Sequence, residues 1–315
     1  MEFLITESHT GKLLRDYLRS ELGLSAALLT ELKKRERGIV LNGERVTVRA
    51  VLTKGDRLSL DIEDTEADEN PYLAPVELPI DIIYEDDALI AVNKPARMVT
   101  HTTHGHYGDS LANALYAKYK AEGRAFVFRA INRLDRETSG VVPVAKDRLS
   151  AYRLSKFLQA GKVQKEYIAI VCGRVEGAGE IRGYISRVGE SIITRRVCEP
   201  DEIGAESAHT VYRTLLSGEH FSLLLASPVT GRTHQLRVHF ASLGHPIVGD
   251  TLYGTKSNDI DRQALHALRL KMLHPRTEEA LSLTAPFPDD MRRLCEKCGF
   301  SCEELDFALS SVLNS

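Results

Sequence analysis

An acidic, proline-bounded stretch divides this chain of 315 residues into two parts of different character. Residues 58–70 contain six acidic residues and no basic residue, and Pro71, Pro75 and Pro79 follow them. The preceding residues, 12–57, contain 11 basic and 6 acidic residues, a net charge of +5. A charge reversal bounded by prolines is typical of a domain and its linker. We therefore predict a small domain at 1–65, an acidic linker at 66–79, a larger domain at 80–300 and a C-terminal tail at 301–315.

The overall composition is that of a soluble globular protein and excludes a polybasic nucleic-acid binder. The hydrophobic content is 43%, the charged content is 27% and the net charge is −3. Any anionic partner must therefore bind to a local basic patch. We expect no signal peptide and no membrane span, because the N-terminus lacks the basic and apolar pattern and no apolar run reaches about 18 residues. Five cysteines, an odd number, predict reduced thiols and a cytoplasmic location.

The small domain is predicted to contain two helices followed by a hairpin. Leu14, Leu18 and Leu22 recur at helical spacing, and Ser25 is a suitable N-cap for a second helix. The dipeptide Asn42-Gly43 within 39–48 indicates a tight hairpin, and residues 57–62 alternate as a further strand. The second helix ends in a basic cluster: Lys33, Lys34, Arg35 and Arg37. These cations suit either a solvated helix end, where they complement the helix dipole, or a surface that binds RNA.

The larger domain mixes strands and helices in an irregular order. Two strands are predicted within 80–95 around a turn at 85–87, and one at 140–145. Further strands are predicted at 163–172 and 219–227, and helices at 110–119, 149–160 and 233–243. Because the order is not a repeating strand–helix–strand series, we predict an α+β domain with a mixed, largely antiparallel sheet.

The most unusual stretch is 131-INRLDRETSG-140, which places a carboxylate and two guanidinium groups between apolar, β-prone runs. The runs 126–128 and 140–145 on its two sides suggest a charged loop held close to the core. Neighbouring cations favour the ionised form of Asp135, which then suits a nucleophile, a base or a metal ligand. The alternative is a surface loop with local ion pairs.

Two further stretches supply candidate site residues. In 165-KEYIAIVCG-173, Tyr167 lies on the alternating face of a predicted strand, where packing alone also explains a tyrosine. In 231-GRTHQLRVHFASLGHPIVGD-250, Thr233 and Arg237 are one helical turn apart. The first turn of that helix, whose free backbone N–H groups favour an anion such as phosphate, contains Arg232, His234 and Gln235.

The three stretches NRLDRETSG, KEYIAIVCG and GRTHQLRVHFASLGHPIVGD, in this order, closely resemble the motifs of the RluA-type pseudouridine synthases. The segments VNKPARMVTH at 92–101 and LHALRL at 265–270 also fit that family, so the resemblance spans about residues 80–290. Residues 12–62 are similar to the small RNA-binding domain named after ribosomal protein S-four, a common companion of the family.

The resemblance implies a pseudouridine synthase fold and a cofactor-independent reaction on RNA. A uridine is flipped out of folded RNA, Asp135 acts in breaking the bond between ribose and uracil, and the base reattaches through carbon 5. Tyr167 matches the tyrosine that stacks on the base, and Arg237 the arginine that pairs with the aspartate. Arg133 matches an arginine that fills the space left by the base. Asn132 replaces the histidine of many relatives and puts the RNA target in doubt.

Contacts to RNA are expected from Arg133, Asn132, Arg232, His234, Gln235, Lys33, Lys34 and Arg35. The expected substrate is large-subunit ribosomal RNA, with transfer RNA as the alternative, and the expected state is a monomer. Whether Asp135 attacks the sugar, attacks the base or removes a sugar proton stays open.

The sequence also allows three competing interpretations. His101, His104, His106 and Asp109 resemble a metal-binding group, but the spacing does not match a binuclear hydrolase motif. A second candidate metal site, Cys295, Cys298 and Cys302, lacks an obvious fourth zinc ligand, so we expect no metal. The third interpretation is a non-catalytic RNA-binding or ribosome-assembly factor, which the basic module supports and the set Asp135, Tyr167 and Arg237 opposes.

Overall fold

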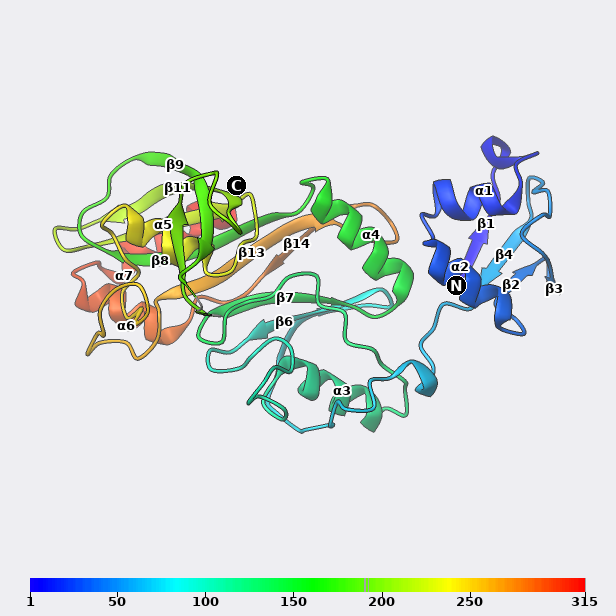
Figure 1. Ribbon diagram of the computed structural model, residues 1–315, viewed down its shortest axis with the longest axis horizontal. Coiled ribbons are helices and arrows are strands. Elements are labelled where there is room, and N and C mark those ends of the chain that lie inside the picture. The colour runs from blue at the N-terminus through cyan, green and yellow to red at the C-terminus, as the bar shows by residue number, and fades with distance from the viewer. Residues whose placement is uncertain (190, 192, 315) are drawn as a thin grey trace.

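The chain forms two β-sheets with separate hydrophobic cores, as the computed structural model shows for residues 1–189, 191 and 193–314 (Figure 1). The small N-terminal sheet has the order β1-β4-β2-β3 and is antiparallel throughout. Its strands are β1 (Glu2–Leu4), β2 (Ile39–Leu41), β3 (Glu44–Arg45) and β4 (Arg57–Leu60). Two helical segments pack against it: α1 (Leu14–Asp16), which continues as a π-helical turn (Tyr17–Glu21), and α2 (Ala26–Lys34).

Local sequence signals of this N-terminal module are confirmed. The Ser25 hydroxyl accepts a hydrogen bond from the Leu28 N–H over 3.1 Å and so caps α2. Asn42 and Gly43 adopt φ angles of 53° and 87°, the left-handed conformation that a tight hairpin between β2 and β3 requires. Strand β1 was not predicted, because its three residues carry too short a pattern for detection.

The large sheet has ten strands and confirms the predicted mixed, largely antiparallel arrangement. Nine strands follow the order β10-β9-β11-β12-β8-β13-β7-β6-β5, and β14 pairs with β13. Among the described strands, β7 and β13 form the parallel pair, and the other neighbours are antiparallel. The strands are β5 (Asp81–Glu85), β6 (Leu89–Lys94), β7 (Ser139–Ala145), β8 (Gln164–Cys172), β9 (Ala178–Arg187), β10 (Arg195–Cys198), β11 (Glu206–Ser217), β12 (Phe221–Pro228), β13 (Leu265–Leu273) and β14 (Ala280–Thr284).

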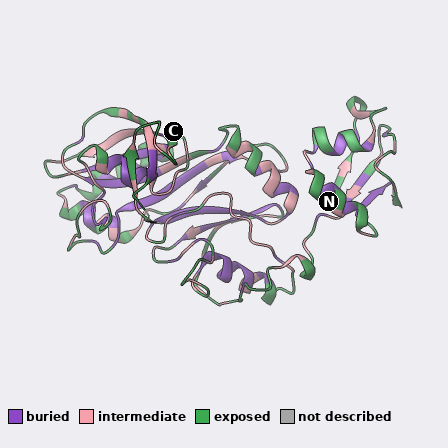
Figure 2. Ribbon diagram, viewed as in Figure 1, coloured by how far each residue is buried: buried purple, intermediate pink, exposed green. Residues whose placement is uncertain are grey.

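Five helices cover this sheet, and the main core lies between four of them, all but the second along the chain, and the central strands (Figures 1 and 2). They are α3 (Leu111–Ala121), α4 (Arg148–Gln159), α5 (Gln235–Ser242), α6 (Asp289–Lys297) and α7 (Cys302–Leu313). Buried residues concentrate along β6, β7, β13 and α3 (Figure 2). None of the helices in the described part of the chain is long and apolar enough to cross a membrane.

Strands β9, β10, β11 and β14 and helix α6 were not predicted from the sequence, and three predicted segments differ in the structure. Residues 126–128 are not a strand, because their backbone N–H groups bind the acidic stretch: Phe126 N–H donates to Glu69 and Val127 N–H to Asp64, both over 3.1 Å. The helix predicted at 233–243 begins at Gln235. Residues 301–315, predicted as a tail, contain α7, whose apolar face packs into the main core because Leu305, Leu309 and Val312 recur at helical spacing.

The acidic stretch, residues 58–70, binds both the N-terminal module and the large domain and does not extend into solvent. Asp64 is buried and pairs with Arg129 over 2.6 Å. Asp68 accepts from Arg35 of the module over 3.2 Å and from Arg148 at the start of α4. Leu149 of α4 packs in the apolar core of the module, which lies beside the N-terminal end of that helix (Figure 1). The module is therefore held in a defined place by charge and by apolar contact.

A stability test follows from α7. Leu305 is fully buried, so Leu305→Ala is expected to lower the free energy of unfolding by about 2–5 kcal/mol. Phe307 on the same helix is 79% exposed, so Phe307→Ala is expected to change it by less than about 0.5 kcal/mol. Urea unfolding measures both. Equal effects of the two substitutions would show that α7 does not belong to the core.

Candidate active site

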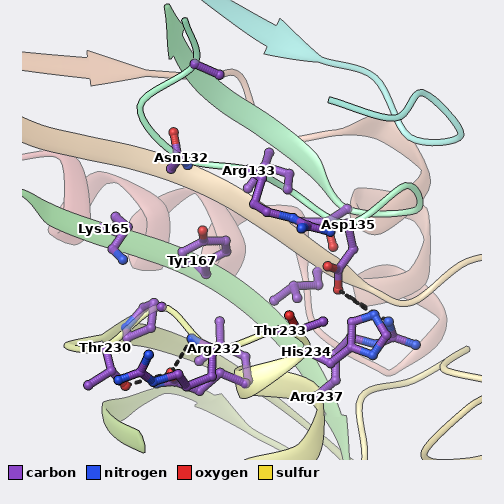
Figure 3. A pocket seen from close by; sticks show the side chains of 18 of the residues that line it. Asn132, Arg133, Asp135, Lys165, Tyr167, Thr230, Arg232, Thr233, His234 and Arg237 are labelled. Carbon is purple, nitrogen blue, oxygen red and sulfur yellow. Dashed lines mark hydrogen bonds and ion pairs between the residues drawn. The ribbon is translucent and has the colours of Figure 1, made fainter. Parts of the chain in front are cut away.

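A cavity of about 370 Å³ opens between the loop 130–138, strand β8 and the loop that leads into α5 (Figure 3). Its volume lies in the range typical of small-molecule sites. Asp135 reaches it from the first loop, Tyr167 from β8 and Arg237 from the first turn of α5. The structure therefore brings together three side chains that are far apart in sequence and that the motifs singled out.

The loop that carries Asp135 is braced on both sides. The Thr100 hydroxyl accepts from Leu134 N–H and donates to Leu134 C=O, both over 3.1 Å. The Lys94 ammonium donates to Arg136 C=O over 3.3 Å and to Met98 C=O over 2.7 Å. Burial lowers the pKa of Lys94 to about 7, although the nearby Asp135 and Glu137 oppose this. These contacts fix the backbone around the carboxylate.

A glycine ends the loop because no other residue fits there. Gly140 has a φ of 117° in β7, and an added Cβ would lie 2.2 Å from the Ala267 carbonyl oxygen of β13. The parallel pairing of β7 with β13 at this point depends on that close approach. The Thr-Ser-Gly end of the charged stretch thus lets the chain turn from the cavity directly into the core of the sheet.

Arg237 lies between two carboxylates. Its Nε and one terminal nitrogen donate to the two oxygens of Asp250 over 2.7 and 2.8 Å, and the other terminal nitrogen donates to Asp135 Oδ2 over 3.3 Å (Figure 3). Asp250 is fully buried and Arg237 is 7% exposed. The bidentate pairing fixes the plane of the guanidinium, and its remaining edge is directed at Asp135.

His234 adds a second nitrogen near the same carboxylate. Its Nε2 lies 3.7 Å from Asp135 Oδ2, and its Nδ1 lies 2.8 Å from the Tyr253 hydroxyl. Burial lowers its pKa, which Asp135 partly opposes. His234 has a φ of 59°, a left-handed conformation that is strained for a residue with a side chain and that often occurs at functional sites. It is the N-cap residue of α5, which explains why that helix begins later than predicted.

Tyr167 forms part of the cavity wall between β12 and β13. It is 8% exposed and pairs across the sheet with Ala226 and Ala267, whose small side chains leave room for the ring. Burial raises the pKa of its hydroxyl well above the ordinary 10.0, and the Asp135 charge adds to this, while contact with Asn132 acts in the opposite direction. The hydroxyl is therefore protonated in the free protein.

The other predicted site residues of the cavity form two groups: Arg133 and Asn132 on one side, and on the other Arg232 and Gln235, whose polar groups bind within the protein. Arg133 is exposed at the cavity rim, and Asn132 has a buried Oδ1 without a hydrogen-bond partner in the described part of the chain. Arg232 lines the cavity but donates to Glu206 and to Ser207 C=O, both over 2.9 Å.

The Gln235 amide is occupied within the protein. It accepts from the Thr230 hydroxyl and Arg232 N–H, and donates to His209 C=O and the Thr210 hydroxyl. Through these four contacts, Gln235 holds the loop that leads into α5 in place.

The basic cluster of the module lies outside this cavity. Lys33 and Lys34 are exposed at the end of α2. Arg35 behaves differently, since its guanidinium is only 15% exposed and pairs with Glu31 over 3.1 Å and Asp68 over 3.2 Å. Arg35 therefore connects the module to the acidic stretch.

The candidate metal ligands are dispersed. His101 stacks edge-on against Phe128 and lines the cavity, whereas His106 binds Asp109 over 2.6 Å. Cys295 is buried, with a pKa raised by burial to about 12, and Cys302 is exposed. Within the residues that the structure describes, no group of three or more His, Cys, Asp or Glu side chains is arranged to hold a metal ion.

Two residues of the site were not identified from sequence: Asp250, which lies behind the cavity, and Lys165, which lines it. Asp250 ends the third motif, but nothing in the local pattern shows that it binds Arg237 thirteen residues earlier. Lys165 was noted as a strand residue, but its place on the cavity wall beside Tyr167 depends on how β8 pairs. The two-residue spacing from Tyr167 was the signal that both side chains share a face.

The buried Arg237–Asp250 pair predicts a pH-dependent stability. Burial alone raises the pKa of Asp250, but Arg237 and the backbone N–H groups of Leu252 and Tyr253 more than offset this, so the net pKa is below 3.8. Asp250→Asn leaves a buried cation short of a partner and is expected to cost about 3–5 kcal/mol in the free energy of unfolding near pH 7. Because the folded-state pKa is depressed, this contribution is present above the unfolded value and is lost as pH falls below it.

Urea unfolding of wild type and Asp250→Asn across this pH range measures the difference. Asp259→Asn, which removes an exposed ion pair with Lys297, is the matched control and is expected to change stability by less than about 1 kcal/mol. A difference between wild type and Asp250→Asn that stays constant down to about pH 2 would contradict the assignment.

Comparison with known proteins agrees with this arrangement. Residues 88–242 match the family model described as RNA pseudouridylate synthase. The Bacillus subtilis protein described as uncharacterized RNA pseudouridine synthase YjbO is 39% identical over 275 residues, which cover 87% of this chain and 95% of the relative. Ribosomal large subunit pseudouridine synthase D of Vibrio cholerae is 34% identical over 305 residues, 91% of this chain and 86% of the relative.

A solved structure, human RNA Pseudouridylate Synthase Domain Containing 1, shares the fold. It is 26% identical, has a TM-score of 0.55 and covers 74% of this chain and 95% of its own. The large sheet, its helices and the cavity at its centre thus form a pseudouridine synthase fold. Identity above 30% over most of the length of the relatives shows that this chain belongs to the RluA-type family of RNA pseudouridine synthases.

Proposed function

We propose that this enzyme isomerises specific uridines in structured large-subunit ribosomal RNA, with Asp135 as the nucleophile. The observation that supports this most is the carboxylate of Asp135, held 3.3 Å from Arg237 at a cavity that Tyr167 also lines. Relatives named ribosomal large subunit pseudouridine synthase D, such as the Vibrio cholerae protein, support the ribosomal substrate. Pure RNA binding requires no such positioned carboxylate.

The reaction is an isomerisation whose atoms balance within the nucleotide. Asp135 attacks the flipped nucleotide, and the bond between C1′ of the ribose and N1 of uracil breaks. The base rotates, and C5 forms the new bond to C1′ while the bond between Asp135 and the nucleotide breaks and frees the carboxylate. The proton on C5 then leaves and N1 gains a proton. Arg237 and His234 lie beside the carboxylate and hold it in position for both bond changes.

Tyr167 is proposed to stack on the uracil ring and to take part in removing the C5 proton. Its hydroxyl is protonated in the free enzyme because burial and the Asp135 charge raise its pKa. The hydroxyl therefore acts as a relay, rather than as a preformed phenolate: it receives the proton from C5 and passes its own proton to the freed Asp135 carboxylate, whose charge lies near it. The wall formed by β8 keeps the ring fixed, so stacking costs little ordering of the side chain.

The N-terminal module is proposed to be an S-four-like RNA-binding domain that contacts phosphates through the exposed Lys33 and Lys34. Arg35 contributes by fixing the module to the acidic stretch. The proposed state is a monomer, in which Asp135, Tyr167 and Arg237 of the same chain line the cavity. The five unpaired cysteines suit the reducing cytoplasm.

Mapping pseudouridine in total RNA tests the proposed substrate and reagent together. A strain that lacks the protein is complemented with wild type or with Asp135→Asn. We expect one or a few ribosomal sites to be lost and only wild type to restore them. Loss of transfer RNA sites instead would overturn the ribosomal assignment. Restoration by Asp135→Asn would overturn the role of the carboxylate, and unchanged RNA would favour a non-catalytic assembly factor.

A kinetic test addresses Tyr167. Tyr167→Phe keeps the ring but removes the hydroxyl, so RNA affinity is expected to stay within about twofold while kcat falls about 10²–10⁴-fold. Release of tritium from RNA labelled at uridine C5 measures turnover, and filter binding measures affinity. A variant with unchanged kcat would limit Tyr167 to stacking.

A further inference from the structure

Lys165 reaches the same cavity as Tyr167 from the same strand (Figure 3). The two residues are separated by one position of β8, so their side chains share a face. Their Cα atoms are separated by about 6.6 Å along the strand. That span is comparable to the separation of the base and its phosphate within one nucleotide. A base stacked on Tyr167 therefore places its backbone near the Lys165 ammonium.

Lys165 has no acidic partner among the described residues, unlike two of its cationic neighbours. Arg237 binds Asp135 and Asp250, and Arg232 binds Glu206. Glu166, which follows Lys165 in sequence, lies on the opposite face of the strand. Its carboxylate accepts a hydrogen bond from Arg269 Nε over 2.5 Å. Burial lowers the pKa of Lys165, and no neighbouring charge opposes this. A half-buried ammonium without a counter-ion is costly unless a ligand supplies the anion.

The loop opposite Lys165 leaves space for such an anion. Gly231 has no side chain, and a Cβ built on it would lie 3.6 Å from Lys165 Nζ. The Thr230 hydroxyl is turned to Gln235 and the Arg232 guanidinium to Glu206, so neither group competes for the ammonium. Lys165 and this loop both line the cavity, so a ligand in the cavity can bring a negatively charged group to the Lys165 ammonium.

We propose that Lys165 binds the RNA phosphate next to the uridine whose base enters the cavity. The proposal rests on the proposed role of this cavity as the uridine pocket. Uracil and ribose are neutral, so the phosphate is the anionic group of the substrate that an unpaired ammonium recognises. Lys165 is a binding and positioning residue: by fixing the backbone, it aligns the ribose with Asp135.

The test uses a stem-loop RNA that carries the mapped uridine, with Lys165→Met and Lys165→Arg as variants. Lys162→Met is the matched control, because Lys162 is exposed three residues earlier and does not line the cavity. We expect Lys165→Met to lower kcat/KM by at least about tenfold and to reduce the slope of log affinity against log salt by about 0.7. Lys165→Arg keeps the slope, and Lys162→Met keeps kcat/KM. Urea unfolding checks that each variant is folded.

Neutralising single phosphates gives the direct evidence. RNAs with a methylphosphonate on the 5′ or the 3′ side of the uridine are bound by Asp135→Asn protein, with and without Lys165→Met. We expect a methylphosphonate at one of the two positions to weaken binding to the protein that retains Lys165, but not to the Lys165→Met protein. Equal losses with and without Lys165 at both positions would overturn the proposal.

The outcomes separate this proposal from the proposed function. If Asp135→Asn releases tritium as fast as wild type, the reagent assignment fails, and the binding measurements still decide on Lys165. If Asp135→Asn is inactive but Lys165→Met matches wild type in kcat/KM and salt slope, only the phosphate proposal fails.

Discussion

The buried guanidinium of Arg237 connects the core of this protein to its cavity. Two of its nitrogens bind the fully buried Asp250, and the third faces Asp135. A buried cation is stable only when well-placed partners neutralise it. The pair with Asp250 therefore holds Arg237 in the position from which it contacts Asp135. The position of the Asp135 carboxylate thus depends on the helix and the loop that hold this pair.

The remaining cavity is organised around the same carboxylate. Lys94 and Thr100 hold the loop that carries it, and Gly140 lets that loop enter the sheet where β7 meets β13. Strand β8 places Tyr167 and Lys165 on the opposite wall. The proposed reaction is therefore placed between rigid elements, which keeps the reorganisation that it requires small.

Charge also determines how the module is attached. Arg35 and Arg148 approach Asp68 from the module and from α4, and Leu149 adds an apolar contact. The acidic stretch is therefore a structural element. Its carboxylates accept hydrogen bonds from the backbone N–H groups of Phe126 and Val127, which a neighbouring strand would otherwise accept. The exposed lysines at the end of α2 consequently have a fixed position relative to the cavity.

The features that could be predicted from the sequence are those with a local cause. Hydrophobic periodicity and capping located α2, α3 and α4, and the charged stretch pointed to Asp135. Features that depend on distant pairing were missed: the Arg237–Asp250 pair and the core role of α7. The face of α7 was visible as Leu305, Leu309 and Val312, but its partner surface is formed by residues far along the chain. Gln235 was assigned to RNA, whereas its amide is used within the protein.

The most direct test of the account is the single-turnover rate of Arg237→Lys. Lysine keeps the positive charge but cannot bind both oxygens of Asp250 while facing Asp135. The account predicts a fall in tritium release of at least about tenfold, with RNA affinity within about twofold of wild type. An unchanged rate would contradict the claim that the geometry of this guanidinium positions the reacting carboxylate.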